Sequence, residues 1–199
     1  MKSMVKKLMR VGLLVAVLFA VSLLVMPRLN QAFTPPVVQK AATVLPPPGV
    51  KHLPKLEDLI FELTNQARQA KGLPPCIKDA ELTQVARAFS DDMLVRRFFD
   101  HTTPDGVTFD ARLAERYPHR VRIMGENIWF ASGYNLDKIQ KVAKEIVDDW
   151  MTSPGHRDNI LDPRFTHLGV GVSARRNTIR ATQEFVGKSK RFSLRDLMT

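Results

Sequence analysis

The stretch Asp137–Leu161, DKIQKVAKEIVDDWMTSPGHRDNIL, sets the organisation of the chain because it joins a core helix to a histidine that the helix does not need. Apolar residues in its first half recur at alternating spacings of three and one, which is typical of one buried stripe on an α-helix. Asp137 and Gln140 predict a capping box at its start. Pro154 disfavours a helical conformation at the residue before it, so we expect this helix to end near Thr152.

A second, short helix is predicted to follow at once. Ser153 is a suitable N-cap and Pro154 suits the first helical position, so this helix runs to about Leu161. His156 then lies in its first turn. The backbone N–H dipoles at a helix start disfavour an imidazolium ion, so we expect a neutral His156, the form that binds metals or accepts protons.

The amino terminus carries the pattern of an export signal. Val11–Met26 is a run of sixteen uncharged, mostly apolar residues that follows a basic start. A helix of this length spans about 24 Å, less than the ~30 Å hydrocarbon core of a bilayer, so a signal peptide cleaved after Ala32 is favoured over a retained anchor. We therefore expect residues 1–32 to be a signal peptide or signal anchor, and the rest of the chain to be extracytoplasmic, either secreted or held at the membrane by this segment.

The formal net charge of +10 is concentrated at the amino terminus. Residues 1–32 hold five basic side chains and no acidic one, which leaves 25 basic against 20 acidic residues, or +5, for the remainder. A modest positive charge favours the vicinity of anionic wall polymers or lipid head groups. No basic cluster interleaved with aromatic residues indicates nucleic acid as a partner.

Cys76 is the only cysteine among the 199 residues. Exported domains often rely on disulfides, but a single thiol cannot form one within the chain. We expect Cys76 to be a buried free thiol, and the domain to be a monomer that depends on its hydrophobic core.

The composition divides the remaining chain into three parts. Residues 33–54 contain six prolines and no acidic residue, and they show neither helical nor alternating periodicity, so they are predicted to be an extended linker in which His52 is incidental. The folded domain is expected at residues 55–187. Residues 188–199 form a basic tail that is expected to fray.

Periodicity within the domain indicates an α+β fold. The predicted helices before the central one cover residues 56–71, 80–97 and 108–116, and the predicted strands cover 165–173 and 178–186. The strands form a hairpin, and the first of them places glycines on one face, where a second layer can approach closely. This order along the chain, helices first and a hairpin last, favours a fold in which helices pack on an antiparallel sheet. No element is assigned to residues 120–131, and Phe98 and Phe99 are expected in the core.

Three motifs stand in a fixed order along the domain. They are FDHTTP at residues 99–104, GENI at residues 125–128, and DWMTSPGHRDNIL at residues 149–161, followed by LGVGV at residues 168–172. In this order and spacing they resemble the CAP superfamily, the SCP-like extracellular domains, and specifically its bacterial branch. The resemblance covers about residues 56–186. It implies an α-β-α sandwich with a surface cleft in which two histidines and one or two glutamates converge.

The resemblance assigns three residues to that cleft, namely His101, Glu126 and His156. Two imidazoles and a carboxylate can carry out acid–base chemistry without a metal, or can form a three-ligand zinc site with an open fourth position. His101 and His156 are the expected metal ligands if zinc binds. Glu126 could equally be an internal acceptor for backbone N–H groups.

One position departs from the family pattern. Many eukaryotic members carry a glutamate three residues after the helix tryptophan, and this chain has Ser153 there, as bacterial relatives commonly do. Asp149 or Glu145 could supply a second carboxylate, although each lies about one helical turn or more from the family's position.

Three functions are compatible with these residues, because the family's fold does not fix a reaction. The preferred one is a binding module that acts at or outside the cell envelope and takes a lipid, a peptide or a wall component in the His/Glu cleft. The alternative is a metal-dependent hydrolase that uses the same cleft. The third is a structural envelope protein in which the polar cluster only holds loops together.

Overall fold

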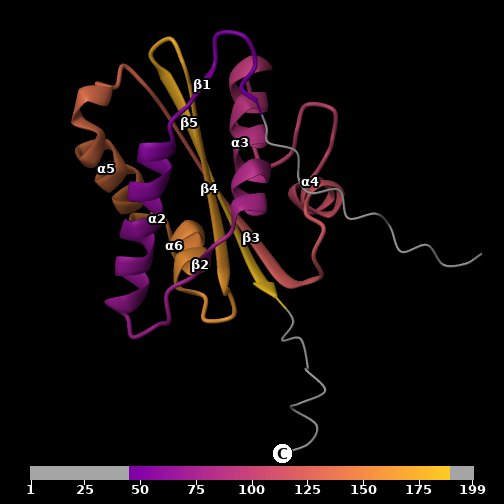
Figure 1. Ribbon diagram of the computed structural model, residues 1–199, viewed down its shortest axis with the longest axis vertical. Helices are drawn as coiled ribbons and strands as arrows, with labels where there is room; N and C mark the ends of the chain where they lie inside the picture. The colour runs from indigo at the N-terminus through magenta and orange to yellow at the C-terminus, as the bar shows by residue number, and fades with distance from the viewer. Residues whose placement is uncertain (1–44, 189–199) are drawn as a thin grey trace, which may run out of the picture. The chain divides into compact units, whose positions relative to one another are not determined.

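The computed structural model describes residues 45–188, and its centre is a five-stranded sheet (Figure 1). The strands pair in the order β1-β4-β5-β3, all antiparallel, while β2 pairs with β4 in parallel. Their bounds are β1 Lys51–His52, β2 Ile77–Lys78, β3 Val121–Ser132, β4 His167–Arg175 and β5 Thr178–Lys188. The predicted hairpin is thus confirmed as β4 and β5.

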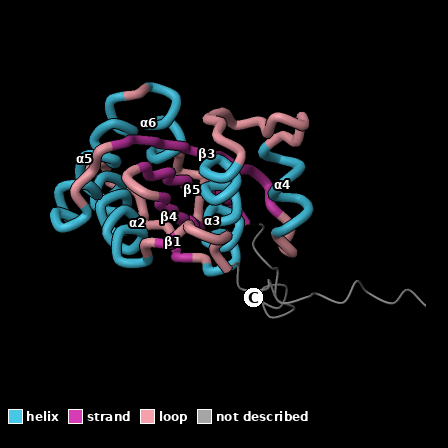
Figure 2. The backbone as a smooth tube through the Cα atoms, turned by 90° about the horizontal axis from the view of Figure 1, so that it is seen from above, coloured by secondary structure: helices cyan, strands magenta, loops and turns pink. Residues whose placement is uncertain are grey.

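Helices cover both faces of this sheet, as the view from above shows (Figure 2). One face carries α2, α5 and α6, and the other carries α3 and α4. Their bounds are α2 Pro54–Gln69, α3 Ala80–Val95, α4 Phe109–Arg116, α5 Ile139–Thr152 and α6 Pro154–Leu161, with a 3-10 turn, η1, at Leu136–Lys138 before α5. This arrangement confirms the predicted α-β-α sandwich and every predicted helix. The Asp137–Gln140 capping box is not formed, because Asp137 lies within η1 and Lys138 occupies the N-cap of α5.

The largest hydrophobic cluster lies between the sheet and the layer of α2 and α5. Trp150 of α5 is 1% exposed, and its indole N–H donates to the carbonyl oxygen of Ile128 at 3.0 Å. On the opposite face, Gly169 and Gly171 leave no room for a β-carbon, which would lie 2.2–2.4 Å from backbone atoms of α3. Large apolar residues therefore alternate with glycines along β4, and this alternation sets how closely the helices on each face approach the sheet.

The folded domain begins earlier than the sequence predicted. Val50 is buried, Lys51 and His52 pair with β4, and α2 starts at Pro54. His52 is not incidental, since its Nε2 contacts a carboxylate oxygen of Asp91 at 3.0 Å. The expected signal segment, most of the linker and nearly all of the basic tail lie outside the described residues. Within residues 45–188, no helix is long and apolar enough to cross a membrane.

Two further expectations need correction. Residues 120–131, to which no helix or strand was assigned, form most of the twelve-residue strand β3. Its central residues are buried on both faces of the sheet, which hides the alternation that normally reveals a strand. Phe99 is 40% exposed and packs at a tilt against the exposed Phe130, so it belongs to the surface rather than to the core.

A buried arginine connects distant parts of the fold. The Arg68 side chain of α2 is fully buried and donates hydrogen bonds of 2.8–3.1 Å to the backbone carbonyls of Pro74, Ile160, Asp162 and Phe165. Cys76 lies beside it as a buried free thiol, as expected. The guanidinium thus joins the first helix to the segment that links α6 with β4.

Candidate functional site

The outer edge of β3 carries the candidate site. Strand β3 ends the sheet on this side, so its outward carbonyl groups need donors from elsewhere. The Asn159 side chain of α6 donates to the Glu126 carbonyl at 3.1 Å, and the Trp150 indole donates to the carbonyl of Ile128 further along the strand. Helices α5 and α6 thereby hold the edge of the sheet in place.

The His101 ring is fixed by Glu126, one of the two other residues expected to lie near it. Nδ1 of His101 lies 2.8 Å from Oε1 of Glu126, so this nitrogen donates to the carboxylate and Nε2 is left facing away from it. Oε2 of the same carboxylate accepts from Arg112 of α4 at 2.7 Å, and Arg112 also donates to the His101 carbonyl at 2.7 Å. The carboxylate is thus held from two sides, and its orientation sets that of the imidazole.

His156 reaches the same edge of the sheet through Asn127. The Asn127 amide donates to the His156 carbonyl at 3.1 Å and to Gln183 at 3.0 Å, while its oxygen accepts from Asn159 at 2.9 Å. Gln183 in turn donates to Thr64 of α2 at 2.7 Å. This largely buried network fixes the first turn of α6, where His156 lies.

The pKa values of the two histidines are shifted in opposite directions. The hydrogen bond to Glu126 raises the pKa of His101, whose side chain is half exposed. Burial lowers the pKa of His156, and the charge on nearby His101 lowers it further. His101 therefore keeps its proton to higher pH than His156, and the lowered pKa of His156 agrees with the neutral imidazole expected at the start of α6. We refer to His101, Glu126 and His156 together as the histidine site.

A second carboxyl group lies beside Glu126, on Glu184 of β5. The two residues are partners in the β3–β5 register. Glu184 is fully buried, and neither of its carboxyl oxygens meets a donor among residues 45–188. Burial, followed by the charge of Glu126, raises the pKa of Glu184 well above its ordinary value. Glu184 therefore keeps its proton to higher pH than an ordinary glutamate.

Sequence reasoning sought this second carboxylate in the wrong places. Asp149 instead accepts a hydrogen bond from the Trp129 indole at 2.8 Å. Glu145 bonds Tyr134, and burial together with this hydrogen bond raises the pKa of Tyr134 to about 12. Glu184 went unnoticed because nothing in a strand sequence shows which residue faces it across the sheet. The only signal was an acidic residue inside an otherwise uncharged stretch of strand.

The donor set at the histidine site falls short of a three-ligand zinc centre. No group of three or more His, Cys, Asp or Glu side chains within residues 45–188 is arranged to hold a metal ion. Both oxygens of Glu126 are already engaged by His101 and Arg112. Two imidazoles remain as ligands, so zinc binding by His101 and His156 stays a prediction.

Comparison with known proteins identifies the family. Residues 61–185 match the Cysteine-rich secretory protein family, CAP. The chain therefore belongs to the CAP family, and the resemblance noted in its motifs is confirmed.

Relatives of the chain are found in Bacillus subtilis (strain 168). The uncharacterized protein YkwD is 40% identical over 133 residues, which are 66% of this chain and 47% of YkwD. The uncharacterized membrane protein YlbC is 34% identical over 116 residues, 58% of this chain and 31% of YlbC. The matched region thus spans about half of the first relative and about a third of the second.

Solved structures share the fold. An extracellular protein containing an SCP domain from Bacillus anthracis is 32% identical with a TM-score of 0.55, over 68% of this chain and 41% of that protein. An outer surface protein from Borrelia burgdorferi gives a TM-score of 0.60 at 18% identity, over 70% of this chain and 98% of that protein. The second likeness concerns the fold alone.

Proposed function

We propose that this CAP-domain protein works at or outside the cell envelope and binds a polar ligand at the histidine site. The observation that carries the proposal is that Glu126 holds Nδ1 of His101, while the pKa of His101 is raised and that of His156 is lowered. Protonated His101 can donate from Nε2, because Nδ1 is held by Glu126. Neutral His156 can accept a hydrogen bond. Such a pair suits a ligand group that both accepts and donates, such as a peptide amide or a sugar hydroxyl.

Peptide or glycan of the cell wall is the ligand class that best fits this pairing. Both groups carry repeated N–H, O–H and carbonyl functions, whereas an aliphatic lipid chain would leave both imidazoles unpaired at the site. A location outside the cytoplasm is supported by the export pattern of residues 1–32 and by the extracellular relative from Bacillus anthracis. Amino-terminal sequencing of the protein from fractionated cells tests the location, with a start near Phe33 expected after cleavage.

Cosedimentation with purified, insoluble peptidoglycan tests the binding function. We expect the full-length wild type to be retained and the His156→Ala variant to lose most of this retention. His119→Ala is the matched control, because His119 is a partly exposed histidine whose partner is Glu81, outside the histidine site. Equal retention of all three proteins would rule out the histidine site as the binding surface.

Acid–base hydrolysis at the same site is the second candidate function. The specific observation in its favour is again the separation of the two histidine pKa values, because one group then supplies a proton while the other receives one. Release of new amino or reducing ends from peptidoglycan would indicate hydrolysis, and its absence would leave the binding role. Activity that survives a chelator would assign the chemistry to the side chains, whereas activity restored by zinc would support the metal-dependent form.

A further inference from the structure

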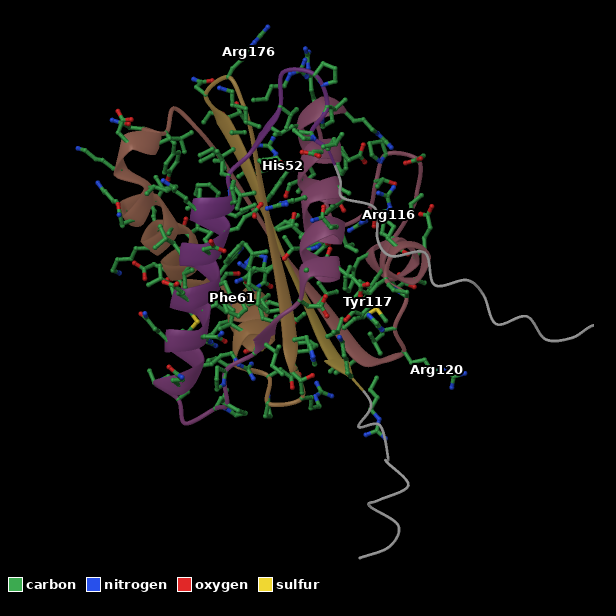
Figure 3. All side chains as sticks on the ribbon, viewed as in Figure 1. His52, Phe61, Arg116, Tyr117, Arg120 and Arg176 are labelled. Carbon is green, nitrogen blue, oxygen red and sulfur yellow. The ribbon has the colours of Figure 1, made fainter. Side chains whose placement is uncertain are left out.

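A cavity of about 480 Å³ lies at the end of the sheet where β4 turns into β5. It is formed by the end of α3, the last residues of β3 and the β4–β5 turn. Four of its lining residues are arginines and none is acidic, namely Arg97, Arg175, Arg176 and Arg180. Figure 3 shows Arg176 at the tip of this turn, at the opposite end of the molecule from Arg120.

These four arginines form no ion pair with a carboxylate, unlike several other arginines of the described chain. Arg87, Arg96, Arg112 and Arg164 each form an ion pair with a carboxylate, but none of the four cavity arginines does so within residues 45–188. Arg97 and Arg176 are exposed and Arg175 and Arg180 are half-buried, so four like charges repel one another around the cavity. An anion bound there would relieve this repulsion.

Arg180 has the most constrained guanidinium of the group. Its Nε is buried without a hydrogen-bond partner among the described residues, and its Nη1 donates to the Ile179 carbonyl at 3.2 Å. The guanidinium carbon lies 4.9 Å from the ring centre of Phe130 and 5.7 Å from that of Phe99. Burial lowers the pKa of Arg180. The aromatic rings therefore fix a cation that still has an unused donor.

The backbone supplies an independent indication. Arg97 and Arg176 have φ angles of 59° and 56°, and within residues 45–188 they are the only residues other than glycine with a positive φ. Arg97 follows the end of α3 and Arg176 lies in the two-residue turn of the hairpin, where glycine or asparagine is usual. Both strained positions carry arginines that line the same cavity. A glycine at either position would relieve the strain but remove a charge.

We propose that this cavity binds a phosphate group. Guanidinium groups recognise phosphate through paired N–H···O bonds, and several cations together favour a compact oxyanion over a single carboxylate. The exposed rings of Phe99 and Phe130 lie next to Arg180 and offer an apolar surface for whatever carries the phosphate. A lipid head group and a soluble phosphate ester share this chemistry. The site is separate from the histidine site and does not depend on the function proposed for it.

The test compares two double variants of the full-length protein, purified in an uncharged maltoside detergent and free of phosphate. Arg97→Gly/Arg176→Gly removes two cavity charges while placing glycine where the backbone favours it, so folding is preserved. Arg120→Ala/Arg122→Ala removes two exposed arginines that form no ion pair within the described chain. The change in net charge is the same. Thermal unfolding of both variants verifies that they are folded.

Isothermal titration calorimetry with inorganic phosphate and with glycerophosphoglycerol measures the binding, with glycerophosphocholine as the zwitterionic control. We expect saturable binding of phosphate by the wild type, at least about tenfold weaker in Arg97→Gly/Arg176→Gly and within about twofold of wild type in Arg120→Ala/Arg122→Ala. Tighter binding of glycerophosphoglycerol than of phosphate would identify a lipid head group as the source, and the reverse a soluble phosphate. No saturable binding, or equal weakening in both double variants, would overturn the proposal.

Discussion

Glu126 of β3 and Glu184 of β5 are partners on adjacent strands, and the two side chains that bond this pair, Arg112 and His101, both bond Glu126 and leave Glu184 without a donor among residues 45–188. The Glu126 carbonyl is bound by Asn159 at the outer edge of β3, so this cross-strand pair is of the type without mutual backbone hydrogen bonds, in which side chains approach most closely. Two adjacent buried carboxylates cannot both ionise at low cost. The pair therefore holds a proton, and the histidine site rests on a buried acid.

The buried acid predicts how stability responds to pH. Because the pKa of Glu184 is raised in the folded protein, its contribution to folding stability is fully present below about pH 4.3, the pKa of a glutamate in the unfolded chain. This contribution is lost as pH rises through the pKa of Glu184 in the folded protein. Glu184→Gln keeps the shape and a donor but cannot ionise. We expect it to increase the free energy of unfolding by about 1–3 kcal/mol at pH 8 and by much less near pH 4.5, measured by urea denaturation.

A matched control for this experiment is Glu115→Gln, which removes an exposed carboxylate on α4. Its effect on stability should be small and nearly independent of pH. If the difference in the free energy of unfolding between wild type and Glu184→Gln does not change with pH, Glu184 is ionised in the folded protein. The proposal that the Glu126–Glu184 pair holds a proton is then refuted.

The two histidines are predicted to titrate on opposite sides of about 6.5, the ordinary imidazole value. His101 should titrate above it because Glu126 bonds its protonated ring, and His156 below it because of burial and the charge of His101. NMR titration of the ring protons measures both. Glu126→Gln should lower the pKa of His101 towards its ordinary value. In the wild type, the His101–Glu126 pair contributes little stability because the ring is half exposed, and this contribution is lost as pH rises through the pKa of His101. Coincident titration of both rings would contradict the proposed donor–acceptor pair.

The core position of Trp150 predicts a large stability effect. Trp150→Ala removes a fully packed indole and its hydrogen bond to the Ile128 carbonyl, so the free energy of unfolding should fall by about 3–5 kcal/mol. Trp150→Phe, which keeps most of the apolar ring, should cost less. Chemical denaturation followed by circular dichroism gives both values. A loss below about 1 kcal/mol for Trp150→Ala would contradict the packing described.

The close approach of α3 to β4 predicts that replacing a glycine by alanine is costly in β4 and harmless in α6. A β-carbon on Gly171 would lie 2.2 Å from the backbone nitrogen of Arg87, so Gly171→Ala must displace α3 and should destabilise by about 1–3 kcal/mol or more. Gly155 in α6 has no atom within 4 Å of such a carbon. Gly155→Ala should therefore be neutral or stabilise by up to about 1 kcal/mol. Melting temperatures of the two variants test this, and equal values would contradict the close packing of α3.

Most of the fold was predictable because its helices are amphipathic and its hairpin alternates. The proline at the start of α6 marked the boundary of that helix to within a residue or two. Strand β3 was missed because Glu126 and Asn127 are polar yet buried, which a local pattern cannot distinguish from a loop. Tertiary contacts with Arg112 and Gln183 satisfy them, and those contacts follow from the register of the sheet.

The three predicted site residues were found from motifs, whereas their supports were not. His101, Glu126 and His156 stand in short recognisable segments of sequence. Arg112 and Glu184 lie in helix and strand sequence that carries no recognisable motif. Only the structure shows that both lie next to the Glu126 carboxylate. Groups that tune a site from a distance in sequence are therefore the ones that a single sequence conceals.

The four carbonyls gathered by Arg68 give the domain a cross-link that requires no oxidant. A disulfide in this position would open in a reducing environment and would have to be formed again after transport. The guanidinium keeps its donors at any redox potential. The domain can thus reach the same folded state on either side of a membrane, so that where it folds and where it acts are not tied together by thiol chemistry.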